Sequence, residues 1–438
     1  MLWIRELLAL CIAGIVTANP LATQDQRKLD QRALTVYHTE NFYNERIAAR
    51  AQWEKTLKRF HVPITEQVSS DLNTTVNELV FSSIQKAVNG DPSDPHVYWV
   101  DTAARTHNWF GLKVKGGRYS YDNPDCIYRV IPISDKYSYR IHGRRYGKGV
   151  ADVSFSLISN PNSQQTVHAL YGKDLHVDND GFYTITINAS DTKSRNHIQS
   201  SWQVKQAFIR HNLGDWSSEI PDDLEVEIVD GPGHSKPYTN KEIIASAKKN
   251  LGESTFFYGF GALDLKTYSE PLNHPKPPQQ SQFLGTLTSQ AQSFAPFQLK
   301  DNQTLVVTLT KGNASYFVFP IYTEGMITTD PGRRQVSLNN AQSFQNHNGS
   351  FTYVISKRDP GIYNWLDTAG RNSGTTMIRW QGLATSGDAA KGIEVYSQVV
   401  PFDRLSSVLP NETKKVSSAQ RKQLLEERAA NYDRIHYQ

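Results

Sequence analysis

The 438-residue sequence contains only two cysteines, Cys11 and Cys126, and three methionines. Cys11 lies in an apolar leader that we expect to be removed, so Cys126 would be the only thiol left and no intramolecular disulfide could form. The fold must therefore depend on its hydrophobic core, which a chain of this length can build. Since no histidine lies near Cys126 in the sequence, we interpret it as a buried residue rather than a nucleophile.

The sequence also lacks the short motifs that identify several large enzyme classes. It contains no H-E-x-x-H, no G-x-S-x-G, no phosphate-binding loop and no G-x-G-x-x-G, and its thirteen histidines are scattered. These absences argue against zinc hydrolases, α/β-hydrolases and nucleotide-dependent enzymes. We expect no cofactor and no metal centre.

The chain also lacks a strong excess of positive or negative charge. The formal net charge is +4, and basic residues alternate with acidic ones along the chain, so no patch for nucleic acid is predicted. The one long apolar run is residues 7–16, preceded by Arg5 and followed by Val16-Thr17-Ala18, the pattern of a secretory signal and its cleavage site. Ten apolar residues are too few to cross a bilayer. We therefore expect a secreted, extracellular chain without a stable membrane anchor; its oligomeric state stays open.

Glycosylation acceptors agree with secretion. N-x-S/T sequons occur at six positions, several of them in expected turns: Asn73, Asn188, Asn302, Asn313, Asn348 and Asn411. Which of them carry glycan cannot be read from the sequence.

Two parts of the chain resemble each other at a spacing of 168 residues. Residues 181–187 lie over residues 349–355, and the same shift brings Asn196 over Asn364. Each copy opens with a hairpin dipeptide, Asp180-Gly181 or Asn348-Gly349, and continues with the alternating pattern of a strand. We interpret this as an internal duplication and predict a mainly β protein of two related jelly-roll-like β-sandwiches with N-terminal, connector and C-terminal helices.

The predicted organisation has six segments. They are a signal peptide (1–18), a helical N-terminal region (19–95), a first β-sandwich (96–230), a connector with a Pro-rich linker (231–282), a second β-sandwich (283–400) and a C-terminal tail and helix (401–438). Thr239 and Glu242 form a capping box that begins the connector helix, and Gly252 is expected to end it. The last helix is expected to turn Leu425, Ala429 and Tyr432 toward the protein and its charged residues toward water.

The strongest candidate for chemistry is the loop 359–371. A Pro-Gly turn, the acids Asp359 and Asp367, Asn364 and the large aromatic Trp365 lie together there, with three arginines nearby: Arg358, Arg371 and Arg379. One interpretation is a ligand pocket with a Trp wall, carboxylates and a guanidinium anchor. The other is a loop that satisfies its own polar groups and closes one end of a sandwich.

Two acidic groups are weaker candidates for a functional site. The turn Asp122-Asn-Pro-Asp125, with Tyr128 and Arg129 close by in the sequence, could offer carboxylate oxygens to Ca²⁺ but is better explained as a structural turn. The four residues Asp174, His176, Asp178 and Asp180 are better explained as a solvated sheet edge that ends in the hairpin turn.

The residues 337–342, 355–370 and Arg379-Trp380 resemble the conserved-domain family DUF1214, which often accompanies DUF1254. Looser similarity extends to residues 122–128, 139–143, 210–216 and 421–432, and so covers most of the chain after the leader. The resemblance implies a jelly-roll-like sandwich and no particular reaction. A paired DUF1254 arrangement is not evident.

These observations leave three hypotheses for function. The first is a secreted protein that binds a small polar, saccharide or aromatic ligand at a sandwich end or between the sandwiches. The second is a hydrolase with Asp359 or Asp367 as acid or base, which requires a deep pocket and a carboxyl of raised pKa. The third is a structural extracellular protein.

Overall fold

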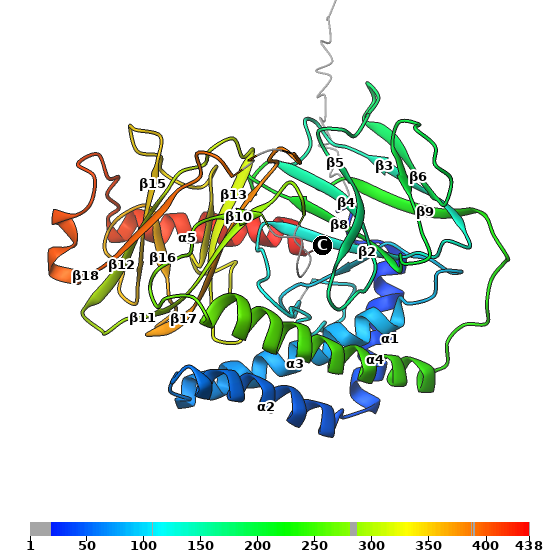
Figure 1. Ribbon diagram of the computed structural model, residues 1–438, viewed down its shortest axis with the longest axis horizontal. Helices are drawn as coiled ribbons and strands as arrows, with labels where there is room; N and C mark the ends of the chain where they lie inside the picture. Colours follow the sequence, from blue (N-terminus) through cyan, green and yellow to red (C-terminus); the bar gives the residue numbers. More distant parts are fainter. Residues whose placement is uncertain (1–18, 107, 281–286, 387, 389, 438) are drawn as a thin grey trace, which may run out of the picture.

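The structure, a computed structural model, describes residues 19–106, 108–280, 287–386, 388 and 390–437; the expected leader 1–18 lies outside them. Three helices form the N-terminal region: α1 (Gln24–Thr39), α2 (Tyr43–Arg59) and α3 (Glu66–Val88). Thr23 and Thr65 begin α1 and α3 because their hydroxyl groups accept hydrogen bonds from the backbone N–H three residues later. Figure 1 shows α2, α3 and α4 along one side of the molecule, beneath both sandwiches.

The first sandwich consists of two antiparallel sheets apart from one parallel pair. Its strands are β1 (Tyr98–Val100), β2 (Cys126–Pro132), β3 (Ser138–Arg144), β4 (Asp152–Ile158), β5 (Thr166–Tyr171), β6 (Phe182–Asn188), β7 (His197–Gln199), β8 (Gln206–Asn212) and β9 (Asp223–Asp230). One sheet has the order β1-β2-β8-β4-β5 and the other the order β7-β6-β3-β9.

The second sandwich repeats this arrangement. Its strands are β10 (Gln279–Gln280), β11 (Ala291–Gln298), β12 (Gln303–Leu309), β13 (Tyr316–Tyr322), β14 (Ser337–Asn339), β15 (Phe351–Ser356), β16 (Trp365–Asp367), β17 (Ser373–Gln381) and β18 (Val395–Pro401). The sheet orders are β10-β11-β17-β13-β14 and β16-β15-β12-β18, so each strand has a counterpart in the first sandwich. Figure 1 shows the two sandwiches side by side.

The predicted duplication is confirmed down to the register. The parallel pair β6–β7 joins Thr186 to His197, and β15–β16 joins Val354 to Trp365, each shifted by 168 residues. The hairpins that precede them also agree, because Gly181 and Gly349 have φ of 88° and 85° and donate to the carbonyl three residues earlier. Positive φ explains the glycine at both turns. The predicted fold class, two related sandwiches with additional helices, is therefore correct.

Each sandwich has its own core, and a third cluster lies among the helices and the facing sheets. Alternate strand residues fill the sandwiches, for example Ile141 and Phe155 in the first and Phe317 and Trp380 in the second. The third cluster joins α1, α3 and the connector to the strands β2, β8, β11 and β17. The outward face of one sheet of each sandwich is thus buried between the domains rather than in water.

The connector differs from the sequence-based expectation. Helix α4 (Asn240–Ser254) begins at the predicted capping box of Thr239 and Glu242, but Gly252 does not end it. The chain continues without a break into a π-helix, η1 (Thr255–Tyr268). Gly252 is tolerated there because the apolar residues after it, such as Leu263, are buried against the helical layer.

The C-terminal helix α5 (Ser418–His436) begins at the predicted Ser417/Gln420 capping box, after a short 3₁₀-helix, η2 (Phe402–Ser407). Its buried face was only partly predicted. Tyr432 is buried as expected, but Arg421 and Arg428 are buried too, because carbonyl and carboxylate oxygens of the second sandwich accept their N–H groups. Arg434 reaches the first domain through the carbonyl of Glu219, at 2.9 Å, so α5 ties the two halves together.

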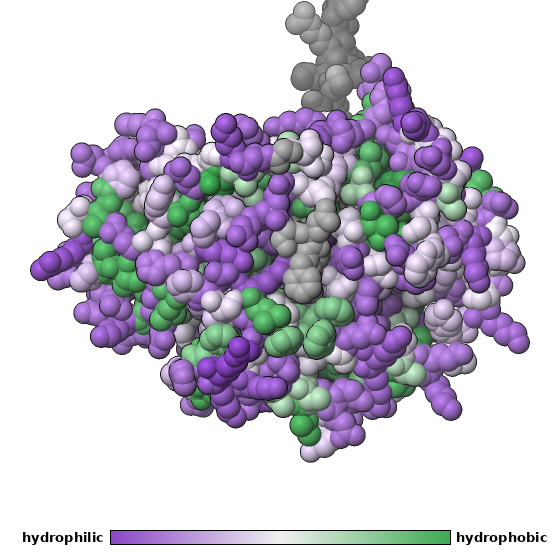
Figure 2. All heavy atoms as spheres, viewed as in Figure 1, coloured by the Kyte–Doolittle hydropathy of each residue, from purple (hydrophilic) through white to green (hydrophobic). Residues whose placement is uncertain are grey.

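The surface is polar in the main. On the face shown in Figure 2, hydrophilic residues predominate and hydrophobic ones lie in small separate groups. Within the residues the structure describes, none of the helices is both long and apolar enough to span a membrane.

Candidate functional site

The loop 359–371, the strongest candidate in the sequence, is closed. Trp365 is only 7% exposed and packs in a small apolar cluster with Val306, Val354 and Leu405. Its indole N–H donates to the Ser356 carbonyl at 3.2 Å. The guanidinium of Arg421, from α5, lies 5.1 Å from the ring centre. The ring therefore fills space under the C-terminal helix.

The two carboxylates of this loop are paired within the chain, whereas the buried hydroxyl of Thr368 has no partner among the described residues. Asp359 accepts from the Gly361 amide at 2.8 Å and from Arg421 at 3.0 Å. Asp367 accepts from Arg334 at 2.9 Å and from the Ala369 amide at 2.8 Å. These contacts favour the structural interpretation of the loop over the pocket interpretation.

Asn364 explains why the duplication keeps its asparagine. It donates to and accepts from the backbone of Phe344, each at 2.8 Å. Asn196 makes the same pair of bonds with His176, 168 residues earlier, at 2.7 and 2.8 Å. The shared asparagine therefore fixes the backbone of the loop segment before the hairpin in both sandwiches.

The three candidate arginines are not brought together. Arg358 stacks on the Phe402 ring, 3.7 Å from its centre. Arg371 binds Asp71 of α3 through two N–H groups, at 2.6 and 2.7 Å, rather than the loop carboxylates. Only Arg379, on β17, lies in a cavity, and that cavity is between the sandwiches.

The acidic turn at residues 122–125 joins the two domains through hydrogen bonds. Asp125 accepts from Tyr316 at 2.6 Å, from Trp216 at 2.9 Å and from Asn339 at 2.9 Å. Burial raises its pKa to about 6. Asp122 accepts from the backbone and side chain of Thr328. The turn has a structural role, as the sequence favoured.

The remaining sequence candidates lie outside any shared site. Asp178 accepts from the amides of Asp180 and Phe182, as a hairpin turn requires. Cys126 is buried, which raises the pKa of its thiol. Across the described part of the chain, no three His, Cys, Asp or Glu residues are grouped to hold a metal ion. The sequon asparagines are exposed except for the half-buried Asn188.

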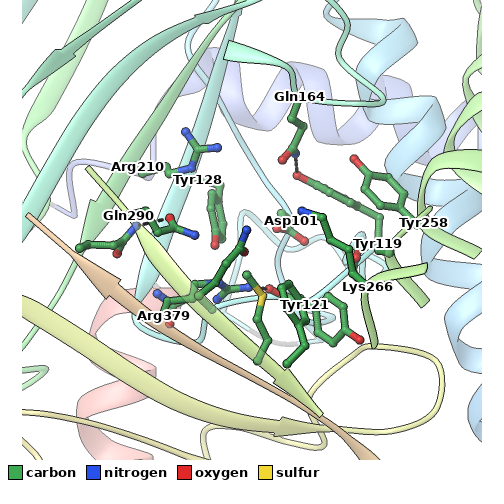
Figure 3. A pocket seen from close by; sticks show the side chains of 17 residues that line it. Asp101, Tyr119, Tyr121, Tyr128, Gln164, Arg210, Tyr258, Lys266, Gln290 and Arg379 are labelled. Atoms are coloured by element: carbon green, nitrogen blue, oxygen red, sulfur yellow. Dashed lines mark hydrogen bonds between the residues drawn. The ribbon is translucent and has the colours of Figure 1, made fainter. Parts of the chain in front are cut away.

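A cavity of about 80 Å³ lies between the two sandwiches and the π-helix. Its lining comes from the segment after β1, from β2, the β4–β5 loop and β8 of the first sandwich, from η1, and from β11 and β17 of the second together with Gln290 just before β11. Figure 3 shows the principal side chains around it, among them four tyrosines: Tyr119, Tyr121, Tyr128 and Tyr258.

The two sandwiches contribute equivalent positions to this cavity. Arg210 on β8 pairs with Ser154, the third residue of β4, and Arg379 on β17 pairs with Val318, the third residue of β13. Since β4 and β13 are counterparts, the two guanidinium groups come from the same place in each copy. Both arginines are buried, at 6% exposure each. The cavity therefore lies at a pseudo-symmetric interface, and each sandwich contributes one guanidinium group to it.

Several buried polar atoms at the cavity lack a hydrogen-bond partner among the described residues. They are Oδ1 of Asp101, the hydroxyl of Tyr258, Nη1 of Arg379 and Oε1 of Gln381. Buried polar atoms are almost always paired, so four at one cavity is a marked concentration. Asp101 also has a positive φ of 58°, a backbone strain that is common at functional sites.

Electrostatics at the cavity favour anions. Burial, with the nearby Asp122 carboxylate, raises the pKa of Asp101 well above its usual value, which favours its neutral form. Burial lowers the pKa of Lys266, on η1, to about 8. Lys86 lies close by, 4.6 Å from the Tyr119 ring centre, and burial lowers its pKa to about 8 as well. The cavity thus has more cationic than anionic groups.

Sequence reasoning missed most of this site. The ungapped shift of 168 residues places Arg210 over Ile378, one residue away from Arg379, and so hid the equivalence of the two arginines. Tyr119, Tyr121, Asp101 and Lys266 come from segments in which the sequence analysis found no motif, and Tyr128 from the segment 122–128 that shows only loose family similarity. A gapped alignment of the two copies at β8 and β17 was the signal that could have found the arginine pair.

Comparison of the sequence with protein-family models and with curated proteins finds no match. Solved structures do show likeness. An uncharacterised protein of Burkholderia cenocepacia superposes with a TM-score of 0.70 at 20% identity, over 85% of this chain and all of that one. The Vibrio parahaemolyticus protein VPA0106 gives a TM-score of 0.42 at 9% identity, over 64% of this chain and 90% of that one. At such identities the first likeness concerns the fold alone, and the second is too low to support an argument.

Proposed function

We propose that the protein binds a small polar ligand in the cavity between its two sandwiches. The observation that carries this proposal is the concentration of unpartnered buried polar atoms there, on Asp101, Tyr258, Arg379 and Gln381. Leaving such atoms unpaired costs folding free energy, about 1–3 kcal/mol each. A ligand that pairs with them would recover that free energy as affinity.

The size of the cavity narrows the choice among ligands. At about 80 Å³ it is roughly half the ~150 Å³ that a benzene-sized guest occupies in a protein core. This supports a small polar molecule over a larger aromatic ligand or a whole saccharide.

A thermal-shift screen tests the proposal. The panel contains short carboxylates, hydroxy acids, amino acids, polyols and monosaccharides, each added to the wild type and to two variants. Ala262→Leu places extra carbon atoms in the cavity from η1, whereas Ala48→Leu adds them on the exposed side of α2.

We expect at least one compound to raise the melting temperature of the wild type and of Ala48→Leu but not of Ala262→Leu. The proposal fails if no compound stabilises the wild type, or if the stabilisation persists in Ala262→Leu.

A hydrolase remains the second candidate, with one observation in its favour. The raised pKa of Asp101 is what a buried general acid requires, and Asp101 lines the cavity, whereas Asp359 and Asp367 do not belong to its lining. Turnover of a compound from the panel that Asp101→Asn abolishes while binding survives would favour the enzyme over the binder.

We propose further that the chain is a secreted glycoprotein related to the DUF1214 family. The N-terminal apolar run and the exposure of five of the six sequon asparagines support secretion. The family assignment is supported by the sequence resemblance at residues 337–370. N-terminal sequencing of the exported product, with Asn19 expected first, and glycosidase treatment test the two secretory features.

A further inference from the structure

The cavity has two chemically different ends, and this allows a narrower statement about its ligand. We propose, resting on the function proposed above, that the cavity selects a small hydroxycarboxylate. Its carboxylate would lie against Arg379, and its hydroxyl group against Asp101 and Tyr258. Figure 3 shows Arg379 and Tyr258 at opposite sides of the cavity with Asp101 between them.

The anionic end follows from Arg379. One of its terminal nitrogens donates to the Tyr121 carbonyl, and the other, Nη1, has no partner among the described residues. Arg210 approaches from the equivalent strand of the first sandwich and donates to Ser156 at 2.9 Å. A planar guanidinium with one free N–H edge, and a second guanidinium in the same cavity lining, suit an oxyanion.

The number of donors favours carboxylate over phosphate. A phosphate dianion presents three or more strongly hydrated oxygens, each of which needs a donor when it is buried. The free donors at this end are few, and acceptors are close by: Oε1 of Gln381 is unpartnered within the described chain. A carboxylate has two oxygens and one charge, which a single guanidinium edge can satisfy.

The second end requires a group that both donates and accepts hydrogen bonds. Oδ1 of Asp101 and the hydroxyl of Tyr258 are the unpartnered atoms there. A ligand hydroxyl can donate to one and accept from the other, whereas a methyl group would leave both unpaired. An acid with a hydroxyl group on a two- or three-carbon frame has the two kinds of group that the two ends of the cavity require.

Calorimetric titration with matched probes tests the inference. L-Lactate and propionate differ by one hydroxyl group, and inorganic phosphate is the alternative anion. We expect the wild type to bind lactate at least about tenfold more tightly than propionate, because propionate leaves two buried polar atoms unpaired. Phosphate is expected not to displace lactate at equal concentration.

Two tyrosine variants test whether the preference for lactate over propionate depends on the Tyr258 hydroxyl. Tyr258→Phe removes the unpartnered hydroxyl and should reduce the lactate preference to less than about threefold. Tyr353→Phe is the matched control, since it removes a buried hydroxyl that bonds Ser343 within the second sandwich, at 2.7 Å, away from the cavity lining. It should keep the tenfold preference.

The possible failures are distinguishable. Equal affinity for lactate and propionate, an unchanged preference in Tyr258→Phe, or displacement of lactate by phosphate overturns the hydroxycarboxylate inference but leaves a binding cavity. If neither acid binds while another compound of the panel does, the inference fails in the same way. If no compound of the panel binds in a manner that Ala262→Leu abolishes, the proposed function fails with it.

Discussion

The two equivalent loops after β6 and β15 show what the duplication kept and what it changed. Both use an asparagine, Asn196 or Asn364, to hold the backbone of the loop segment before the hairpin, at His176 or Phe344. At the next position the first copy has the half-buried His197 and the second has the buried Trp365. The difference follows the C-terminal helix, because α5 covers only the second loop through Arg421. At this position the residue peculiar to the second copy marks a local packing partner rather than a ligand site.

The largest effect on stability is expected at the position where the two loops differ most, Trp365 in the second copy and His197 in the first. Trp365→Ala should lower the free energy of unfolding by about 3–5 kcal/mol, because it leaves a cavity under α5. His197→Ala, at the equivalent position, should cost about 1 kcal/mol or less because its side chain is only half buried. Denaturant unfolding measures both; similar losses would mean that the two loops are packed alike.

A histidine makes the interior of the first sandwich acid-sensitive. His211 on β8 pairs with Val153, the second residue of β4, and Trp380 on β17 pairs with Phe317, the second residue of β13, so the two are equivalent. Burial lowers the pKa of His211 to about 4, and the nearby Asp222 opposes this only in part.

The sign of the pH effect follows from that pKa. The unfolded chain takes up a proton near pH 6.5, whereas the folded chain does so only near pH 4, so acid favours unfolding. This stability is present above pH 6.5 and is lost as the pH falls toward 4, by about 3 kcal/mol in all. In His211→Gln the loss over this window should be smaller by about that amount. His347→Gln, at an exposed site, is the control and should keep the pH profile of the wild type. A pH profile of His211→Gln identical to that of the wild type would contradict the expectation.

The asparagines test what the two copies share. Asn364→Ala and Asn196→Ala should each lower the free energy of unfolding by about 2 kcal/mol, since each leaves a backbone N–H and a carbonyl without their partner. The loss should be greater for Asn364, which also donates to the Thr352 carbonyl at 3.1 Å. Denaturant unfolding of both variants, with the exposed Asn302→Ala as reference, measures this. Losses near zero at either site would show that the asparagine is not architectural.

The smallest expected effect compares two buried tyrosines without ligand. Tyr353→Phe should destabilise the protein by about 1 kcal/mol through the lost bond to Ser343. Tyr258→Phe removes a hydroxyl with no partner in the described chain, so its stability should be unchanged or slightly higher. Equal destabilisation in thermal unfolding of the two apo proteins would mean that the Tyr258 hydroxyl is already satisfied.

Much of the fold could be predicted from the sequence because its signals are local. The dipeptides at Gly181 and Gly349, the alternating strands after them and the capping boxes at Thr239 and Ser417 each act within a few residues. Gly252 was misleading for the opposite reason: packing of the residues after it outweighs its own preference to end a helix. Likewise, Arg421 and Arg428 are buried because distant carbonyls accept their N–H groups, which no local pattern reveals.

The candidate site could hardly be predicted. The cavity exists only where two sheets and a π-helix meet, and it draws Asp101, Tyr258 and Arg379 from three separate segments. Of the loop candidates only Arg379 lies there, joined by Asn123 and Tyr128 from the weaker candidate at the acidic turn. The conspicuous acids Asp359 and Asp367 instead bind arginines of the same chain. Composition within one loop cannot distinguish a self-paired cluster from an open one.

The central claim is that the polar site lies between the sandwiches and not in the loop 359–371. A crystal structure of the protein soaked with the compound that stabilises it most in the screen tests this directly. We predict ligand density between Arg379 and Tyr258, in contact with Asp101. Density against Trp365 and Asp367 with α5 displaced, and none between the sandwiches, would contradict the account.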